Sequence, residues 1–297
     1  MTSSPAQSVF FLPLARTITL YLISSIDNPV RLTILGSGGA TPTPRPFCQC
    51  PICEKAKKES EPYKRNSSSL FVDEAFVLID CAEDIGDSLN RREINRVDNL
   101  FITHWHPDHT FGLRPLLEAC FNFLENKADK QIAIYMPKRV LEDLMQHYPS
   151  ISYLADHLKV ADIHRIEHEE SVQIGKVQIT AIGYESKDSR VFAYLLEQDG
   201  KKALYAPCDT LSFKQRIYDL DLLINECGVF SYDKIKDEIS FPKLMERIRL
   251  LRPKRTVLTH IEEIELNAWG WDYLNRMKKQ YSDINFDFAY DGMEIQI

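Results

Sequence analysis

Hydrophobic residues along this chain form short runs. They predict consecutive strands followed by strands that alternate with helices, and this succession of elements occurs twice. Apolar, β-prone runs predict strands at 31–35, 69–72, 76–79, 99–103, 132–136, 172–182, 191–196, 203–206, 222–224 and 256–258, with two further β segments around Asp291-Gly292. Apolar residues at helical spacing predict helices over 84–92, 111–125, 138–146, 241–251 and 269–280. This order predicts an α/β sandwich in which helices lie outside two packed sheets.

The regular pattern begins at residue 31 and continues to residue 297. We therefore expect one large domain over residues 31–297, preceded by an N-terminal extension over residues 1–30. The apolar stretch within that extension is interrupted by Pro13 and Arg16. Because a signal peptide or a membrane span needs an unbroken apolar segment, we expect neither there.

Composition and charge exclude several classes of protein. Hydrophobic residues make up 44% of the chain and charged residues 27%, as in soluble globular proteins. The net charge of −7 is unlike that of proteins that bind nucleic acid through a broad basic surface. We therefore expect a small anionic substrate, no nucleic acid and no membrane partner, and a homodimer is possible. The odd number of cysteines, seven, suits a reducing compartment, so we expect a cytoplasmic protein.

The strongest chemical signal follows the strand predicted over 99–103. It consists of His104, His106, Asp108 and His109. Residues two apart on an extended segment point the same way, so His104 and His106 can present their imidazoles to one ion. A proline then turns the chain, and Asp108 and His109 project toward a second position nearby. Imidazole and carboxylate suit zinc, manganese or iron, and two such ions can share a bridging hydroxide.

Two other predicted strands end in a residue that can bind a metal. Asp209 follows the strand over 203–206, and His260 follows the strand over 256–258. Residues at strand ends are held by the sheet, which is how a metal site obtains a fixed geometry. We therefore expect Asp209 and His260 to be ligands beside the first motif.

A proline-rich loop carries three cysteines at Cys48, Cys50 and Cys53. These spacings aim the sulfur atoms inward around a turn, so three thiolates can close on one tetrahedral ion, which then needs a fourth ligand. The alternative is three free thiols in a tight loop. The remaining cysteines lie in apolar runs and are predicted to be ordinary buried thiols: Cys81, Cys120, Cys208 and Cys227.

Over about residues 31–297 the chain resembles the metallo-β-lactamase superfamily of di-metal hydrolases. The motifs that carry the resemblance are Thr103-His104-x-His106-x-Asp108-His109, Cys208-Asp209-Thr210 and Thr259-His260. Other segments are similar to the phosphodiesterase family of the carbon-phosphorus lyase pathway, which opens phosphoribosyl 1,2-cyclic phosphate. They are Gly36-Ser37-Gly38-Gly39, the cysteine loop, Ile79-Asp80, Tyr194-Leu195-Leu196-Glu197 and Asp291-Gly292-Met293-Glu294-Ile295.

This resemblance implies a four-layer αββα fold, two zinc or manganese ions in the active site and one structural zinc. It implies that one active-site ion is bound by His104 and His106. The other ion has the implied ligands Asp108, His109 and His260, and Asp209 bridges the two. The implied fourth ligand of the cysteine site is Glu263, at a position where the family has a histidine. We expect Asp108 and Asp209 to be catalytic, and Asp80 to fix a ligand histidine.

The sequence departs from the family pattern in two places. The family has a further ligand histidine shortly before the strand of Tyr194, whereas the stretch 183–190 contains none. Glu185 or Asp188 could replace it, the first ion could be bound more weakly, or His164 or His168 could be recruited from earlier in the chain. The family also has a histidine after the pair that corresponds to Glu226-Cys227, where this chain has Gly228-Val229.

The sequence therefore predicts a metal-dependent hydrolase, and the resemblance favours a phosphodiesterase acting on a small (cyclic) phosphodiester. A thioester or lactone hydrolase on the same centre is the alternative enzyme, and processing of tRNA 3′ ends is a third activity that the negative charge opposes. A metal-binding scaffold with impaired catalysis is the alternative from a different class.

Overall fold

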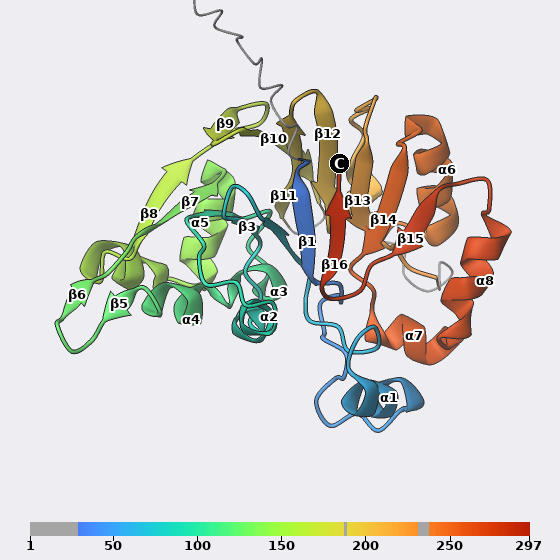
Figure 1. The fold of residues 1–297 in the computed structure, drawn as a ribbon, viewed down its shortest axis with the longest axis horizontal. Coiled ribbons are helices and arrows are strands. Elements are labelled where there is room, and N and C mark those ends of the chain that lie inside the picture. Colours follow the sequence, from blue (N-terminus) through green and yellow to red (C-terminus); the bar gives the residue numbers. More distant parts are fainter. Residues whose placement is uncertain (1–28, 187–188, 231–237) are drawn as a thin grey trace, which may run out of the picture.

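The computed structural model describes residues 29–186, 189–230 and 238–297, so the extension predicted over residues 1–30 lies almost wholly outside the described residues. Within the described part, the long strands form two seven-stranded sheets (Figure 1). The first sheet contains, in spatial order, β16 (Met293–Gln296), β1 (Arg31–Gly36), β2 (Ser69–Val72), β3 (Val77–Ile79), β4 (Asn99–Phe101), β7 (Ile132–Met136) and β8 (Ala161–Arg165).

The second sheet contains, in spatial order, β15 (Phe286–Phe288), β14 (Arg255–Thr259), β13 (Leu222–Glu226), β12 (Lys201–Ala206), β11 (Arg190–Gln198), β10 (Val177–Glu185) and β9 (Ser171–Ile174). A separate hairpin is formed by β5 (Phe121–Asn122) and β6 (Lys127–Ala128). The helices are α1 (Pro51–Glu59), α2 (Ile85–Arg91), α3 (Pro107–Thr110), α4 (Leu113–Glu118), α5 (Lys138–His147), α6 (Phe241–Leu251), α7 (Glu263–Trp269) and α8 (Asp272–Gln280).

The core lies between the two sheets and is joined by residues of both. Phe101 of β4 packs edge-on against Tyr194 of β11, with ring centroids 5.3 Å apart, and the Tyr194 hydroxyl donates to the Ile102 carbonyl at 2.7 Å. Strand residues alternate between the two faces, so Tyr205 of β12 joins this inner cluster while Leu204 joins an outer one. Burial on both faces explains why the middle residues of these strands are all apolar.

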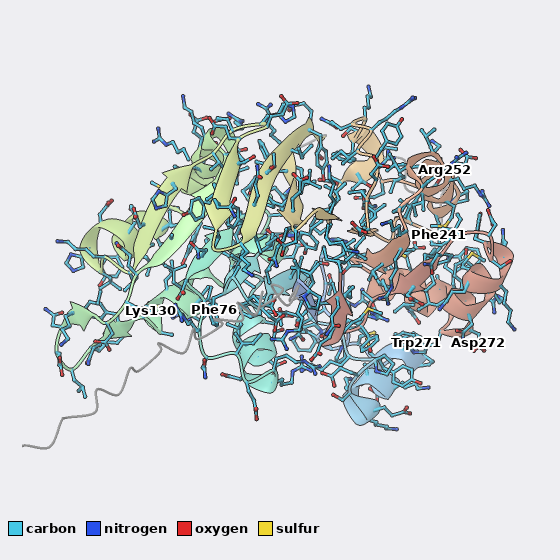
Figure 2. All side chains as sticks on the ribbon, turned by 45° about the horizontal axis from the view of Figure 1, so that its top comes forward. Phe76, Lys130, Phe241, Arg252, Trp271 and Asp272 are labelled. Carbon is cyan, nitrogen blue, oxygen red and sulfur yellow. The ribbon has the colours of Figure 1, made fainter. Side chains whose placement is uncertain are left out.

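The outer cluster packs α6 and α8 onto the second sheet, around Phe241 and Leu244. Figure 2 shows Phe241 and Trp271 at this end of the molecule and Phe76 and Lys130 toward the other. On the other side, α2, α4 and α5 contribute Ile85, Leu117 and Val140 to the cluster of the first sheet, among other residues. The predicted αββα sandwich is therefore confirmed.

One predicted helix was wrong, and not every helix was predicted. The helix predicted over 111–125 is divided into α3, α4 and the β5–β6 hairpin. Gly112 lies against the Ala82 carbonyl, so closely that a Cβ atom would stand 2.0 Å from that oxygen, and this tertiary contact separates α3 from α4. The helix predicted over 269–280 is present as α8, and α7, which was not predicted, precedes it and ends at Gly270 with a positive φ of 76°.

The topology brings the strand ends that carry the metal-competent residues to one place. Strands β3, β4 and β7 run parallel in the first sheet, as do β12, β13 and β14 in the second. Parallel strands have their carboxyl ends at the same edge of a sheet, which is where ligands bind in α/β folds.

No helix among the described residues is long and apolar enough to cross a membrane.

Candidate metal centre

Four loops that follow strand ends form the centre: those after β3, β4, β12 and β14. Asp80, Asp209 and His260 each have a left-handed backbone, with φ of 66°, 52° and 55°. Residues other than glycine adopt this conformation at an energetic cost, and such residues concentrate at functional sites.

The first group of candidate ligands consists of His104, His106 and Asp209, whose donor atoms all lie within 4.8 Å of one another. His104 Nε2 is 3.0 Å from His106 Nδ1. His104 Nδ1 is engaged by the Thr103 hydroxyl at 2.9 Å, so Nε2 is the nitrogen available to an ion. Ser186 donates a hydrogen bond to Asp209 Oδ2 at 2.8 Å, which orients that carboxylate.

The second group consists of Asp108, His109 and His260, again with donor atoms within 4.8 Å of one another. Asp108 Oδ2 lies 3.3 Å from His109 Nε2 and 3.5 Å from His260 Nε2. Two ligand atoms on a tetrahedral ion with bonds of about 2.0–2.1 Å are separated by roughly 3.3 Å. The spacing in this group is therefore that of a metal site.

Burial and neighbouring charges strongly shift the pKa values of these side chains. Burial alone would raise the pKa of the Asp108 carboxyl, but the neighbouring His109 and His260 outweigh it and hold that pKa well below its usual value. Burial would lower the pKa of His109, yet the carboxylates of Asp108 and Asp80 raise it to about 10. Burial and the nearby imidazoles lower the pKa of His104 well below its usual value. The pocket thus carries a buried carboxylate whose charge a cation would match.

Two buried nitrogen atoms at the centre, His109 Nε2 and His260 Nε2, make no well-formed hydrogen bond among the described residues and have only the Asp108 carboxylate close by, at 3.3 and 3.5 Å. A buried polar atom without a partner costs free energy, and native proteins rarely leave one without a reason. Both atoms belong to the second group, next to the Asp108 carboxylate. The donor set therefore fits a divalent ion such as zinc or manganese.

Asp80 contacts residues next to or within both ligand groups: Thr103, which precedes His104, and His109. Its carboxylate accepts hydrogen bonds from the Thr103 amide at 2.8 Å, from the Thr103 hydroxyl at 2.9 Å and from His109 Nδ1 at 2.8 Å. The contact with His109 fixes the tautomer that leaves Nε2 free to bind an ion, as is usual for metal-binding histidines. The contact expected for Asp80 with a histidine of the motif is thus present.

We expect Asp80→Asn to weaken the binding of one active-site ion by about 10- to 100-fold, because an amide no longer fixes the tautomer of His109. Titration of metal into the metal-free protein against a chromophoric chelator measures this. A matched control is Asp84→Asn, since Asp84 is a largely buried carboxyl that accepts the Ser67 amide and is in none of the ligand groups. Equal weakening in both variants would contradict the role of Asp80.

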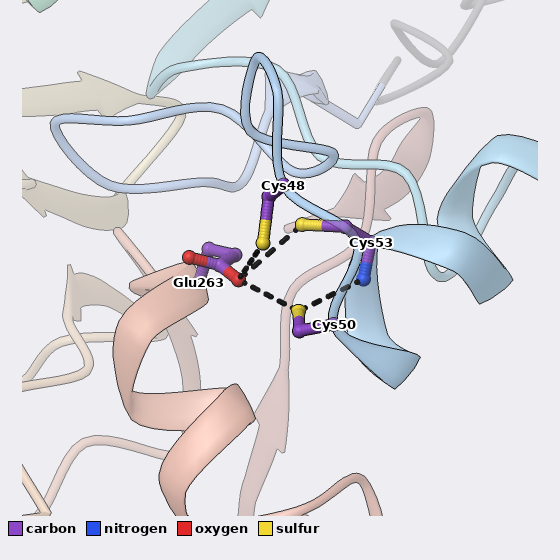
Figure 3. Close-up of side chains that lie close together, drawn as sticks. All are labelled: Cys48, Cys50, Cys53 and Glu263. Atoms are coloured by element: carbon purple, nitrogen blue, oxygen red, sulfur yellow. Dashed lines mark hydrogen bonds between the residues drawn. The ribbon is translucent and has the colours of Figure 1, made fainter.

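A second, separate centre is formed by Cys48, Cys50, Cys53 and Glu263 (Figure 3). Glu263 Oε1 lies 3.6, 3.1 and 3.3 Å from the three sulfur atoms in that order. A sulfur and an oxygen bound to one tetrahedral zinc are separated by about 3.5 Å, given bonds of about 2.3 and 2.0 Å. The four side chains, from the loop before α1, the first turn of α1 and the first turn of α7, therefore have the geometry of a closed structural site.

A positive side chain, Arg45, lies beside this cysteine site. Arg45 places its guanidinium 3.4 Å from Glu263 Oε2 and 3.7 Å from Cys48 Sγ. Three thiolates and one carboxylate exceed the charge of a divalent ion by two, and Arg45 offsets part of that excess. Hydrogen bonds from Cys50 and Arg45 lower the pKa of the Cys48 thiol, whereas burial raises the pKa of Cys53.

The structure does not bring Glu185 to the centre. Its side chain is 76% exposed, and its carboxylate lies 3.4 Å from Arg190 Nε, at the solvent end of β10. Asp188, the other acidic candidate, lies outside the described residues. His164 and His168 are far from full burial and pair with Asp162 and Glu169, and neither is in a candidate ligand group of the described residues.

Sequence reasoning missed one candidate ligand, Cys208. The four cysteines predicted to be buried thiols are indeed buried, but the sulfur of Cys208 also lies within 4.8 Å of donor atoms of His104 and His109. The sequence signal was its position directly before Asp209 at the end of β12. The distance between its sulfur and the histidines is a tertiary feature that the sequence does not contain.

The family described as "Beta-lactamase superfamily domain" matches residues 76–261. The matched segment contains Asp80 and every histidine and aspartate of the two ligand groups. It excludes the four side chains of the cysteine site, since Cys48, Cys50 and Cys53 precede it and Glu263 follows it.

Curated relatives match shorter segments. An octanoyltransferase of Porphyromonas gingivalis is 28% identical over 123 residues, which is 40% of this chain and 23% of that protein. A ribonuclease Z of Haloarcula marismortui is 33% identical over 111 residues, which is 36% of this chain and 29% of that protein. This chain therefore matches less than a third of the length of either protein.

A solved structure matches over nearly the whole length. It is described as a new diphosphatase from the PhnP family, with a TM-score of 0.72, 21% sequence identity, and coverage of 90% of this chain and 98% of that one. At this identity the likeness concerns the fold. The architecture of the two sheets is thus that of a known fold.

Proposed function

The chain belongs to the β-lactamase superfamily, and on that premise we propose that it is a metal-dependent hydrolase whose substrate is a small phosphodiester. One observation carries the proposal. His104, His106, Asp108, His109, Asp209 and His260 converge from separate loops into two adjoining groups of donor atoms. In the second group, the histidine nitrogens that face the carboxylate of Asp108 make no well-formed hydrogen bond among the described residues.

In this proposal the two groups hold two divalent ions, zinc or manganese. Such ions make water a nucleophile near neutral pH and offset the charge that develops on phosphoryl oxygens. Asp209 would contact both ions and the attacking water, while Ser186 holds its other oxygen in place. Asp108 would hold its ion together with His109 and His260, and Asp80 would keep His109 in the required tautomer.

We also propose that the cysteine site holds a structural zinc with Cys48, Cys50, Cys53 and Glu263 as ligands. The cysteine site is connected to the active-site centre by a short segment of chain, which helps to hold His260 in position. His260 precedes Glu263 by three residues, and the intervening Ile261 donates its amide to the Ser37 carbonyl at 2.9 Å. None of the seven cysteines, all of which the structure describes, is in a disulfide. This accords with a cytoplasmic location, which is part of the proposal.

The second candidate is an RNA-processing enzyme, which the similarity to ribonuclease Z favours. The net charge of −7 weighs against it, because a long RNA is held mainly through its phosphates by basic side chains. A small anionic substrate needs only the charge of the ions, so we favour a small phosphodiester. A thioester or lactone hydrolase is the remaining alternative on the same centre.

The test uses the full chain, stripped of metal and reloaded separately with manganese, zinc, nickel or cobalt. We expect metal-dependent hydrolysis of bis(p-nitrophenyl) phosphate, with little cleavage of a thioester or of a tRNA precursor under the same conditions. Faster cleavage of the tRNA precursor would establish the second candidate instead. No hydrolysis of any of these substrates with any of the four metals would leave a metal-binding scaffold as the function and overturn the proposal.

A further inference from the structure

The first group of ligands lacks a third histidine. The chain has eight histidines, and none occurs between His168 and His260. Four of the eight form the centre. The others lie elsewhere: His147 stacks on Trp105 at 3.8 Å, His157 stacks on Tyr153, His164 pairs with Asp162, and His168 accepts the Gly183 amide. A further ligand beside the first group would therefore be a side chain of another type.

Cys208 is placed where such a ligand is needed. It follows Pro207 at the carboxyl end of β12 and is only 7% exposed. Its sulfur and the donor nitrogens of His104 and His109 all lie within 4.8 Å of one another. Because His104 Nδ1 and His109 Nδ1 are engaged by Thr103 and Asp80, the Nε2 atoms are those that can share an ion with the sulfur.

The backbone of Cys208 is held from a neighbouring strand. The hydroxyl of Tyr184, on β10, donates to the Cys208 carbonyl at 2.5 Å, and the Tyr184 ring packs edge-on against Phe213 at 5.0 Å. Tyr184 is itself only 4% exposed. The position of the thiol is thus defined by the sheet, as a ligand position must be.

Cys227 provides an internal comparison. It follows β13 directly, next to β12 in the same sheet, and is 1% exposed. Burial raises the pKa of both thiols well above the usual value. Yet Cys227 is in none of the candidate ligand groups of the described residues, whereas Cys208 is. Proximity to the histidines, rather than burial, distinguishes Cys208.

We propose that Cys208, as a thiolate, is a ligand of the active-site ion at His104, on the side where His104 and His109 lie together. This inference rests on the proposed function, since it concerns the same centre. On binding, the thiol gives up its proton to solvent and the sulfur donates an electron pair to the ion. A thiolate ligand favours zinc, cobalt or iron over manganese or magnesium, so the proposal also names the class of metal.

The experiment compares Cys208→Ser with Cys227→Ser, each as the full chain loaded with cobalt. A thiolate bound to cobalt gives a charge-transfer band in the near ultraviolet. The cysteine site contributes equally to all samples, so it cancels in the difference spectra. We expect Cys208→Ser to lose part of the band of the parent protein, while Cys227→Ser keeps it in full. An undiminished band in Cys208→Ser would overturn the proposal.

A second measurement compares affinities. We expect Cys208→Ser to bind one zinc ion at least about 10-fold more weakly than the parent, since even the loss of a group that only orients a ligand costs about 10- to 100-fold. Manganese affinity should change much less. Cys208→Ala repeats the test without a hydroxyl group, and thermal melting of the metal-free proteins shows that each variant is folded.

The outcomes separate this inference from the proposed function. Unchanged zinc affinity in Cys208→Ser and Cys208→Ala, with the parent still binding two active-site ions and hydrolysing phosphodiester, would withdraw only the cysteine ligand. A parent protein that binds no ion beyond the cysteine site would overturn both.

Discussion

Asp108→Ala is expected to lower the rate of metal-dependent hydrolysis by at least about 100-fold. Loss of a group that only orients a ligand already costs about 10- to 100-fold, and Asp108 is a direct ligand in the proposed centre. Its carboxylate lies 3.3 Å from His109 Nε2 and 3.5 Å from His260 Nε2, so its removal leaves two histidines without the anion between them. Hydrolysis of bis(p-nitrophenyl) phosphate at saturating metal measures the effect.

The fold should survive this change. Asp108 belongs to the four-residue helix α3 in a loop beyond β4, outside both hydrophobic clusters. A matched control is Asp143→Ala, which removes a buried carboxylate of α5 that pairs with Arg139 away from the centre. We expect it to retain activity. Near-parental turnover in Asp108→Ala, or in the companion variant His109→Ala, would show that the proposed centre is wrong.

Cys50→Ser is expected to remove one zinc per chain and to lower the melting temperature by at least about 5 °C. Structural zinc contributes directly to folding free energy. In a domain of about 150–250 residues, each 1 kcal/mol lost lowers the melting temperature by about 2–4 °C, so a loss of about 2 kcal/mol suffices. Cys50 also caps α1, where its sulfur accepts the Cys53 amide at 3.4 Å. Elemental analysis and thermal melting measure the two effects.

The control for this variant is Cys120→Ser, which alters a buried thiol outside every candidate ligand group of the described residues. It should keep the full zinc content. The active-site ions should remain in Cys50→Ser, because their ligands lie on other loops. If the zinc content of Cys50→Ser equals that of the parent protein, the cysteine site is not a zinc site.

The sequence alone determined the features of this protein that depend on residues near one another in the chain, namely its secondary structure and its metal-binding motifs. Strand-forming runs and helical spacing predicted the αββα sandwich, because each element must bury its apolar face against a neighbour. The spacing of His104, His106, Asp108 and His109 indicated a metal site without any tertiary information, since a short segment brings these side chains together. The same holds for Cys48, Cys50 and Cys53.

The tertiary structure decided what depends on contacts between distant segments. A helix over 111–125 agrees with local preference, but the close approach of Gly112 to Ala82 and the β5–β6 hairpin replace it. The sequence offered Glu185 as a substitute ligand because it occupies the right stretch, yet its side chain points to solvent at the end of β10. Which face a side chain takes at a strand end follows from register, and register is set by pairing with other strands.

Cys208 and Cys227 show the same division most clearly. In the sequence both are cysteines in apolar surroundings at the ends of predicted strands. Only the packing of the two sheets against each other places the sulfur of Cys208 beside His104 and His109, more than 90 residues earlier in the chain, while Cys227 stays apart from them. Local sequence therefore determined which residue types can be ligands and which strands carry them. The packing of the two sheets decided which of these residues come into contact.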